Sequence, residues 1–298
     1  MQLINNLEQL NNTEYFKYSV HFNFEEQTTI TMTQDLFKRL SKVSSLRFTN
    51  CNVKLGDFKL NRLRTIRLHN STITPTPRCK LLIDKSFDYT NLDTDIINVA
   101  AIDKDMELKN VPSNIKYLKV SGFSNIDLTS VKDSLEQLTI ENYRRENINE
   151  EVKKCKNLQS LKITRCKHVT DEAYSKCEKL DKLMVSKCKG VQYTNLNTVT
   201  TLAIDSAFKP YGRKHEEFQN ITTLTLPLES ITPNVLSKFH NVKTLSIIYI
   251  PRAPVLNVRI GLRGITRHLR KLKEVHVSRT VNVKLDKNSK ISVISKDY

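Results

Sequence analysis

The sequence of 298 residues contains no tryptophan, only 6 glycines and only 8 prolines. So few chain-breaking residues argue against long flexible linkers and low-complexity segments. No apolar run approaches the roughly 20 residues of a membrane-spanning helix. The amino terminus lacks the basic flank and apolar stretch of a secretory signal peptide. We therefore expect an intracellular protein, cytoplasmic or nuclear, that does not act at a membrane.

Motifs of the common enzyme classes are also missing. The sequence has no Walker loop and no GxGxxG, GxSxG, HExxH or EF-hand pattern. Its 7 histidines are scattered along the chain rather than set at ligand spacing. We therefore expect no enzyme, no catalytic residues, no cofactor and no metal site.

What the sequence does contain is an internal repeat. The segment CKNLQSLKITRCKHV (Cys155–Val169) returns 22 residues later as CEKLDKLMVSKCKGV (Cys177–Val191). Its kernel, L-x-x-L-x-[LIV], recurs with looser flanks along most of the chain. The ten kernels have the anchors Val43, Leu46, Phe48; Leu63, Ile66, Leu68; Ile115, Leu118, Val120; Leu135, Leu138, Ile140; Leu158, Leu161, Ile163; Leu180, Leu183, Val185; Val199, Leu202, Ile204; Ile221, Leu224, Leu226; Val242, Leu245, Ile247; and Leu272, Val275, Val277.

The kernel predicts a short strand, because its last two anchors alternate with polar neighbours. One such strand cannot bury its apolar face alone, so stacked copies must share a core and pair in parallel. We therefore predict an α/β fold: a leucine-rich-repeat solenoid with a curved parallel sheet and irregular helical or loop returns. Degenerate copies at Leu81–Ile83 and Ile97–Ile102 would give about ten to twelve repeats.

We expect three parts along the chain. Residues 1–42 form an amino-terminal cap with a strand at Val20, Phe22 and Phe24, residues 43–280 form the solenoid, and residues 281–298 form a carboxy-terminal cap strand or tail. Among the returns, we expect helices that start at Thr170–Asp171 and at Thr232, and loops only over residues 71–80.

The two central copies resemble the cysteine-containing subclass of leucine-rich repeats, whose kernel reads C-x-x-L-x-x-L-x-L-x-x-C-x-x-[IV]-T-D. Residues 155–171 match it through Val169, Thr170 and Asp171, whereas the second copy departs from it after Val191. The resemblance implies the substrate-recruiting part of an F-box protein. The F-box itself has no counterpart in residues 1–42.

Four of the 6 cysteines, at 155, 166, 177 and 188, are spaced 11 residues apart. Structural zinc sites use close C-x₂₋₄-C pairs, so this spacing argues against metal. We expect buried, reduced thiols, with Cys166 and Cys188 in the turn after a strand, where a thiol can donate weakly to carbonyls. Cys51 occupies the same turn after Phe48.

The residue between the last two anchors of each kernel should point away from the core, onto the concave face. This predicted column starts with basic residues and continues with neutral ones. We predict partner binding by its basic half, Arg47, Arg67, Lys119 and Lys162. The remaining members are Thr139, Met184, Ala203, Thr225, Ser246 and His276.

The repeat does not explain the charge of the chain. Lys and Arg number 48 against 31 Asp and Glu, a net charge of +17, of which +11 falls after Glu229. Within Pro251–Lys273, apolar residues at 260, 265, 269 and 272 have roughly helical spacing with basic residues between them. We predict a site there for an anion or for nucleic acid, formed by Arg252, Arg259, Arg263, Arg267, Arg270 and Lys271.

Three functions remain open. The first is a scaffold or assembly subunit that binds a protein with an acidic surface, alone or within a large complex. The second is an RNA-binding component of a ribonucleoprotein particle. The third, which follows from the family resemblance alone, is an F-box-like ubiquitin ligase receptor. None of them implies a homo-oligomer.

Overall fold

The computed structural model divides the chain into two compact units, Met1–Arg145 and Glu146–Tyr298. The structure describes residues 1–14, 16, 18–58, 62–74, 80–84, 87, 96–103, 105–194, 196–205, 218–248, 258–278, 281–284 and 291–296.

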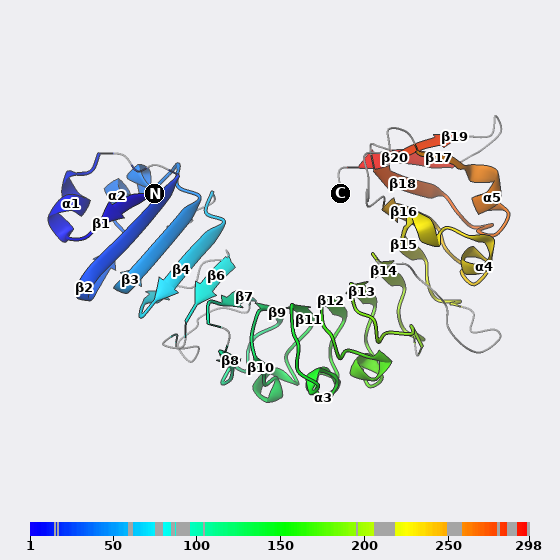
Figure 1. Cartoon of the computed structure of the whole chain (residues 1–298), viewed down its shortest axis with the longest axis horizontal. Helices are drawn as coiled ribbons and strands as arrows, with labels where there is room; N and C mark the ends of the chain where they lie inside the picture. The colour runs from blue at the N-terminus through cyan, green and yellow to red at the C-terminus, as the bar shows by residue number, and fades with distance from the viewer. Residues whose placement is uncertain are drawn as a thin grey trace. The chain divides into compact units, whose positions relative to one another are not determined.

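Most of the elements in the described part of the first unit are strands (Figure 1). Its elements are β1 (Gln2–Ile4), α1 (Leu7–Asn12), β2 (Ser19–Thr31), α2 (Gln34–Arg39), β3 (Ser45–Lys54), β4 (Thr65–His69), β5 (Thr72–Thr74), β6 (Lys80–Ile83), β7 (Ile96–Ala101), β8 (Glu107–Leu108), β9 (Tyr117–Ser121), β10 (Asn125–Ile126), the 3₁₀ helix η1 (Thr129–Val131) and β11 (Gln137–Glu141).

The second unit alternates strands with short helical returns. Its elements are α3 (Ile148–Lys153), β12 (Ser160–Thr164), the 3₁₀ helix η2 (Asp171–Tyr174), β13 (Lys182–Ser186), β14 (Thr201–Ile204), β15 (Thr223–Pro227), the 3₁₀ helix η3 (Leu228–Ser230), α4 (Pro233–Leu236), β16 (Thr244–Ile248), β17 (Val258–Gly261), α5 (Leu262–Thr266), β18 (Glu274–Ser278), β19 (Val281–Lys284) and β20 (Ser292–Lys296).

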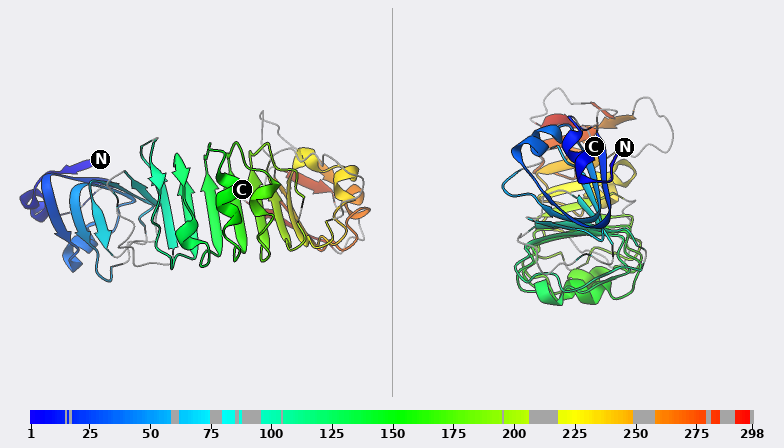
Figure 2. Two further views of the ribbon diagram at one scale, coloured as in Figure 1. Left: turned by 90° about the horizontal axis from the view of Figure 1, so that it is seen from below. Right: turned by 90° about the vertical axis from the view of Figure 1, so that its left-hand side faces the viewer.

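The main strands of each unit lie side by side and run in parallel (Figure 2). In the first unit their order is β1-β2-β3-β4-β6-β7-β9-β11, and in the second it is β12-β13-β14-β15-β16-β18-β20. Short pairs, β8 with β10 and β17 with β19, form on the return side of each unit. In the second unit the helices α3, α4 and α5 lie opposite the main strands (Figure 1). The fold is the predicted leucine-rich-repeat solenoid.

The repeat kernel forms the core. All anchors of the ten kernels are buried, and the most exposed of them, Leu63, is only 9% exposed. The two degenerate copies are strands as well, namely β6 and β7. Leaving out β5, which pairs only with β3, twelve strands of the main strand orders lie between residues 43 and 280 in the described part of the chain, at the upper end of the predicted repeat number.

The amino-terminal strand is also present. Val20, Phe22 and Phe24 are buried in β2, which pairs in parallel with β1 and β3. The ring of Phe22 stacks on that of Phe48, with centroids 5.1 Å apart. The exact limits of the two caps stay a prediction.

A left-handed residue ends many repeats. Asn50, Asn70, Asn142, Arg165 and Lys187 all have φ between 45° and 61°. Each one turns the chain so that the following residue points into the core. Asparagine tolerates this conformation better than lysine or arginine does, so the two central repeats carry some backbone strain here.

The returns differ from the prediction in two places. The helix after Thr232 is confirmed as α4, with the Thr232 hydroxyl accepting a hydrogen bond from the amide of Val235 (3.4 Å). After Thr170, however, the chain forms only the 3₁₀ helix η2, and the Thr170 side chain does not cap it. Residues 72–74 form a strand, β5, which pairs with β3, so the expectation of loops alone over 71–80 was wrong. Within the described residues, no helix is both long and apolar enough to cross a membrane.

Candidate binding surface

The open face of each main sheet is the face opposite the buried anchors. Strand alternation places every second side chain there, for example Arg47 in β3 and Lys162 in β12. Both side chains are half-buried rather than fully exposed, because neighbouring strands crowd them. This face carries all four residues that the sequence predicts for partner binding.

Arg47 and Arg67 lie directly opposite each other on the neighbouring strands β3 and β4. His21 continues the same row on β2. Neither guanidinium has a hydrogen bond or an ion pair within the part of the chain that the structure describes, and the Nε atom of Arg47 is buried without an acceptor. Like charges in register destabilise a sheet. The repulsion in this row therefore lowers the stability of the sheet, whereas the buried anchors beneath the row do not.

The pKa of His21 is sensitive to the charge of this row. It is 8% exposed, and its Nε2 lies 3.0 Å from the Thr49 hydroxyl. Burial, followed by the positive charge of Arg47, lowers the pKa of His21. A neutral imidazole therefore stands beside the two arginines at neutral pH. The predicted strand at Val20, Phe22 and Phe24 places His21 on the opposite face, but the register with Arg47 was not predictable because this segment lacks the full kernel.

Lys119 does not continue the row of Arg47 and Arg67, as the predicted column requires. The pairing of β6 with β7 aligns Leu82 with Ala100, so Arg67 is followed along the row by Leu82, Ala100 and Ser121. Lys119 pairs instead with Asn98, two residues away. Its Nζ also lies 3.0 Å from an Oε1 of Glu141, which neutralises its charge. The irregular spacing between Ile66 and Leu118 hides this shift from sequence comparison.

The open face of the second unit is nearly neutral. Lys162 starts a row that stays in register through six further strands and carries no other cation. No ion pair to Lys162 is formed by the described residues. The rest of this row consists of Met184, Ala203, Thr225, Ser246, His276 and Ile294.

One group on this row has the composition of a hydrolase triad. The Ser246 hydroxyl lies 3.5 Å from Nδ1 of His276, whose Nε2 lies 3.4 Å from a carboxylate oxygen of Glu274. Both distances exceed the roughly 2.6–3.2 Å of an activated nucleophile. The strands β16 and β18 are paired on both sides, so their amides serve the sheet rather than an oxyanion. The group is best explained as packing on a crowded face.

The carboxy-terminal basic segment is only partly helical. Ile260 lies in β17, and α5 spans five residues, so the predicted helical pattern over 260–272 was wrong at its start. From Ile265 onward the pattern holds, because Ile265, Leu269 and Leu272 are buried while Arg267, Arg270 and Lys271 are exposed. Arg252 and the side chains of Arg259 and Arg263 lie outside the described residues.

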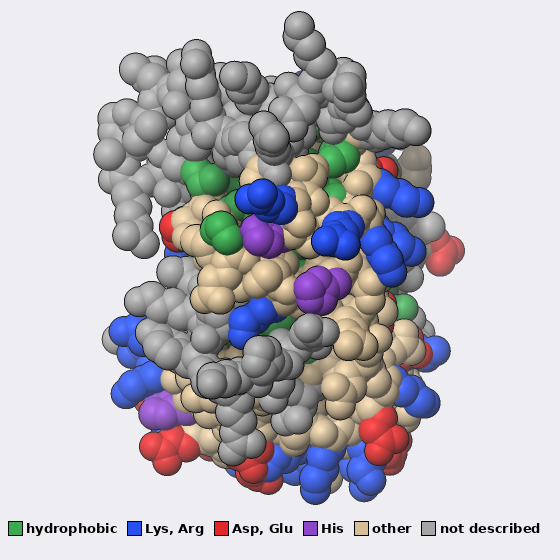
Figure 3. Space-filling view, turned by 90° about the vertical axis from the view of Figure 1, so that its right-hand side faces the viewer, with side chains coloured by type: hydrophobic (Ala, Val, Ile, Leu, Met, Phe, Trp, Pro, Cys, Tyr) green, Lys and Arg blue, Asp and Glu red, His purple; other side chains and the backbone are tan. Residues whose placement is uncertain are grey.

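Two more lysines extend this exposed cluster. The Lys273 amide donates to the Lys243 carbonyl (2.8 Å), so these residues are neighbours just before β18 and β16. Lys271 donates to the Asn241 side chain (2.7 Å), and these two residues also lie just before β18 and β16. We call Lys243, Arg267, Arg270, Lys271 and Lys273 the entry-edge cluster. On the side of the molecule shown in Figure 3, acidic side chains at the lower margin lie among basic ones.

Five of the 6 cysteines lie among the described residues, and they are buried, as predicted. Cys51, Cys155, Cys166, Cys177 and Cys188 are buried and free. The Cys51 and Cys188 thiols each donate to the carbonyl two residues earlier, at 3.2 Å. Burial raises the pKa of Cys51 to about 12 and that of Cys177 to about 11, whereas a hydrogen bond from Cys166 lowers the pKa of Cys188. No group of three or more potential metal ligands occurs among the described residues.

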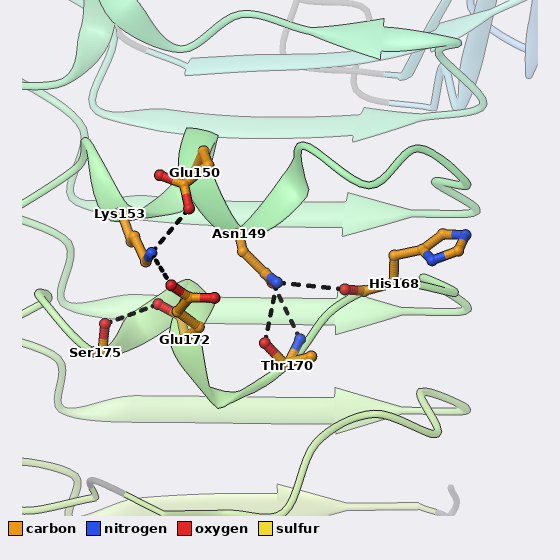
Figure 4. A network of polar contacts seen from close by, with 7 residues as sticks. All are labelled: Asn149, Glu150, Lys153, His168, Thr170, Glu172 and Ser175. Carbon is orange, nitrogen blue, oxygen red and sulfur yellow. Dashed lines mark hydrogen bonds and ion pairs between the residues drawn. The ribbon is translucent and has the colours of Figure 1, made fainter.

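On the return side, polar side chains brace one repeat against the next (Figure 4). The Asn149 amide donates to the Thr170 hydroxyl (3.0 Å), and its oxygen accepts from the Thr170 amide (3.1 Å). Asp171 accepts three further backbone amides, from residues 192, 193 and 194, at 2.8–3.0 Å. The sequence predicted Asp171 as a cap of its own helix, but it caps the following return. This role explains the T-D ending of the repeat.

The acidic side chains of these returns are largely engaged with lysines. Lys153 contacts Glu150 (2.9 Å) and also Glu172, and these carboxylates, Glu172 foremost, raise the pKa of Lys153. Lys154 pairs with Glu151 at 2.7 Å. Charge is thus balanced locally on the return side, in contrast to the row of Arg47 and Arg67.

Residues 1–42 give no support to the F-box alternative. An F-box is a helical segment, whereas the described part of this region contains two helices of only six residues each. The long strand β2 between them belongs to the main sheet.

Comparison with known proteins gives similarity only at the level of structure. No protein-family model and no curated protein matches the sequence. The chain is similar to an internalin (InlF) of Listeria monocytogenes str. 4b F2365, with 13% identity, a TM-score of 0.36, and coverage of 96% of this chain and 88% of that one. It is also similar to TLR13 in a complex with ssRNA13, with 13% identity, a TM-score of 0.39, and coverage of 99% of this chain and 51% of that one.

Proposed function

We propose that this protein is a non-enzymatic scaffold that binds an acidic surface of a protein partner through the open face of its first unit. One observation carries the proposal. Arg47 and Arg67 stand in register on that face without a partner within the described residues, whereas Lys119 nearby is neutralised by Glu141. An acidic partner would relieve the repulsion between the two arginines and satisfy their donors.

Affinity purification from the native source tests this proposal. We compare the wild-type chain with an Arg47→Gln/Arg67→Gln variant, with and without nuclease, over a range of salt concentrations. The expected result is a nuclease-resistant protein partner that is lost in the variant and released as salt rises. Lys119→Gln is the matched control on the same face. A partner retained by Arg47→Gln/Arg67→Gln contradicts the assigned surface.

RNA binding is the second candidate, and the entry-edge cluster favours it. Its five cations are exposed, and no acid occurs between Glu229 and Glu274. Binding to phosphates would show a steep decrease of affinity with salt. Fluorescence anisotropy with a single-stranded RNA measures this for the wild type and for an Arg267→Gln/Arg270→Gln/Lys271→Gln variant.

Lys179 provides a close control for that experiment. It donates to Asn157 of the preceding repeat at 2.8 Å, as Lys271 does to Asn241 at 2.7 Å, but it lies outside the cluster. We expect Lys179→Gln to bind RNA like the wild type and the triple variant to lose most of its affinity. Equal affinity of all three proteins for RNA would end this candidate.

A further inference from the structure

The row of Arg47 and Arg67 has the features of a small anion-binding site. Adjacent parallel strands lie about 4.8 Å apart, so two guanidinium groups in register can reach the same ligand. His21 and Thr49 adjoin them from β2 and β3, linked by their 3.0 Å contact. All of these residues belong to the first unit.

The positive charge of this row is not neutralised from within the described chain. Asp84, at the end of β6, faces other groups: Nδ1 of His69 at 2.5 Å and the amide of Asn70 at 3.1 Å. His21 adds no charge at neutral pH, because its pKa is lowered. Two formal positive charges therefore remain on Arg47 and Arg67.

The number of charges and donors selects among anions. A carboxylate has one charge and two oxygens, and one guanidinium fork satisfies it. A phosphomonoester carries close to two charges and three terminal oxygens, which match two forks. Beyond Arg67 the row continues with Leu82 and Ala100, so a bound group must be attached to a chain that tolerates an apolar floor.

We propose that Arg47 and Arg67 form a subsite for a phosphomonoester, carried by a phosphorylated serine, threonine or tyrosine of the protein partner. This inference rests on the proposed function, because it specifies the chemistry of the same surface. It distinguishes a phosphorylated partner from one that is merely acidic.

Fluorescence anisotropy with peptide pools tests the subsite on the full chain. Three nine-residue pools with degenerate flanks carry phosphoserine, glutamate or serine at the centre. We expect the phosphoserine pool to bind at least tenfold more tightly than the serine pool, with the glutamate pool between them. Arg47→Gln/Arg67→Gln should abolish the preference, and Lys119→Gln should preserve it.

An Arg47→Lys/Arg67→Lys variant separates geometry from charge. Lysine keeps both charges but lacks the planar fork, so the preference for phosphoserine over glutamate should disappear. Equal affinity of the wild type for the two pools, or a lysine variant that behaves like the wild type, would overturn the proposal. The proposal would also be overturned if Arg47→Gln/Arg67→Gln lost RNA binding while the wild type bound no phosphopeptide. Thermal unfolding of each variant checks that it is folded.

Phosphatase treatment distinguishes failure of this inference from failure of the proposed function. If a partner requires Arg47 and Arg67 but still binds after phosphatase treatment, the proposed scaffold function is supported and the phosphate subsite is contradicted. If the partner binds Arg47→Gln/Arg67→Gln as it binds the wild type, the proposed surface itself is wrong. A partner that is lost both in Arg47→Gln/Arg67→Gln and after phosphatase treatment supports the two proposals together.

Discussion

The open faces of the two units differ although the core beneath them is the same. In the first unit, Arg47 and Arg67 bring into register two cations that have no ion-pair partner among the described residues. In the second, the row that starts at Lys162 continues through small or neutral residues, and charge is found on the returns and at the entry edge. The buried anchors specify the stacking of repeats, whereas the residues between them are free to specify a ligand.

The difference also separates what stabilises the fold from what costs it stability. Carboxylates on the returns of the second unit serve the structure, as Asp171 shows by capping the next repeat. Arg47 and Arg67 have no such structural use among the described residues. Side chains that cost stability without structural compensation are expected at functional sites.

The largest predicted effect tests whether the two cores are equivalent. Leu46 and Leu161 hold the same kernel position in different units and are 1% and 0% exposed. Leu46→Ala and Leu161→Ala should each reduce the free energy of unfolding by about 2–5 kcal/mol, through lost burial and the cavity left behind. Urea denaturation measures both.

Met184→Ala is the control for that pair, because Met184 lies on the open face and is 40% exposed. It should change the free energy of unfolding by less than about 0.5 kcal/mol. An effect below about 1 kcal/mol for either leucine variant would contradict a shared core.

The core was predictable from the sequence, while the surface was not. Each kernel repeats its anchors, so the buried face of Leu161 and Ile163 follows from alternation alone. The break between Arg67 and Lys119 depends on how β6 pairs with β7, and those degenerate strands contain no full kernel to set the register. Likewise, the contact of Lys119 with Glu141 joins residues on neighbouring strands, β9 and β11, which no motif relates.

Asp171→Ala is expected to give the second largest effect. Its carboxylate accepts three amides of the following return together with the Thr194 hydroxyl (2.6 Å). Hydrogen bonds to a charged acceptor contribute about 1.5–3 kcal/mol. We expect a loss of about 2–3 kcal/mol in the free energy of unfolding, measured by urea denaturation, with faster hydrogen exchange at residues 192–194.

Glu172→Ala is the matched control in the same return. Among the described residues, the Glu172 carboxylate, whose side chain is 59% exposed, pairs with Lys153, and pairs with such an exposed member contribute at most about 1 kcal/mol. If Glu172→Ala destabilises as much as Asp171→Ala, the return is held by charge in general rather than by the cap.

Opposite signs are predicted for two cations of the first unit. Arg67→Gln should raise the free energy of unfolding by up to about 0.5 kcal/mol, because it removes repulsion from Arg47. Lys119→Gln should lower it by a similar amount, about 0.5 kcal/mol, because it breaks the pair with Glu141. Both changes should shrink between 0.1 and 1 M salt, conditions chosen for their roughly threefold difference in screening length. Destabilisation by Arg67→Gln would mean that Arg67 serves the fold after all.

The smallest predicted effect concerns the pH dependence caused by His21. Its pKa in the folded state lies below the ordinary value of 6.5, through burial first and Arg47 second. The unfolded chain therefore takes up a proton before the folded chain does, and this group lowers stability as pH falls below about 6.5. Above that pH both states are neutral there, and the contribution is constant.

Variants isolate this contribution from that of the other histidines. The difference in free energy of unfolding between the wild type and His21→Gln should be less favourable to the wild type at pH 5.5 than at pH 7.5. In an Arg47→Gln background the change with pH should be smaller but still present, because burial, the larger cause, remains. An equal change with pH in the wild-type and Arg47→Gln backgrounds would show that the imidazole does not sense the charge of Arg47, and would contradict the unneutralised positive charge of this row.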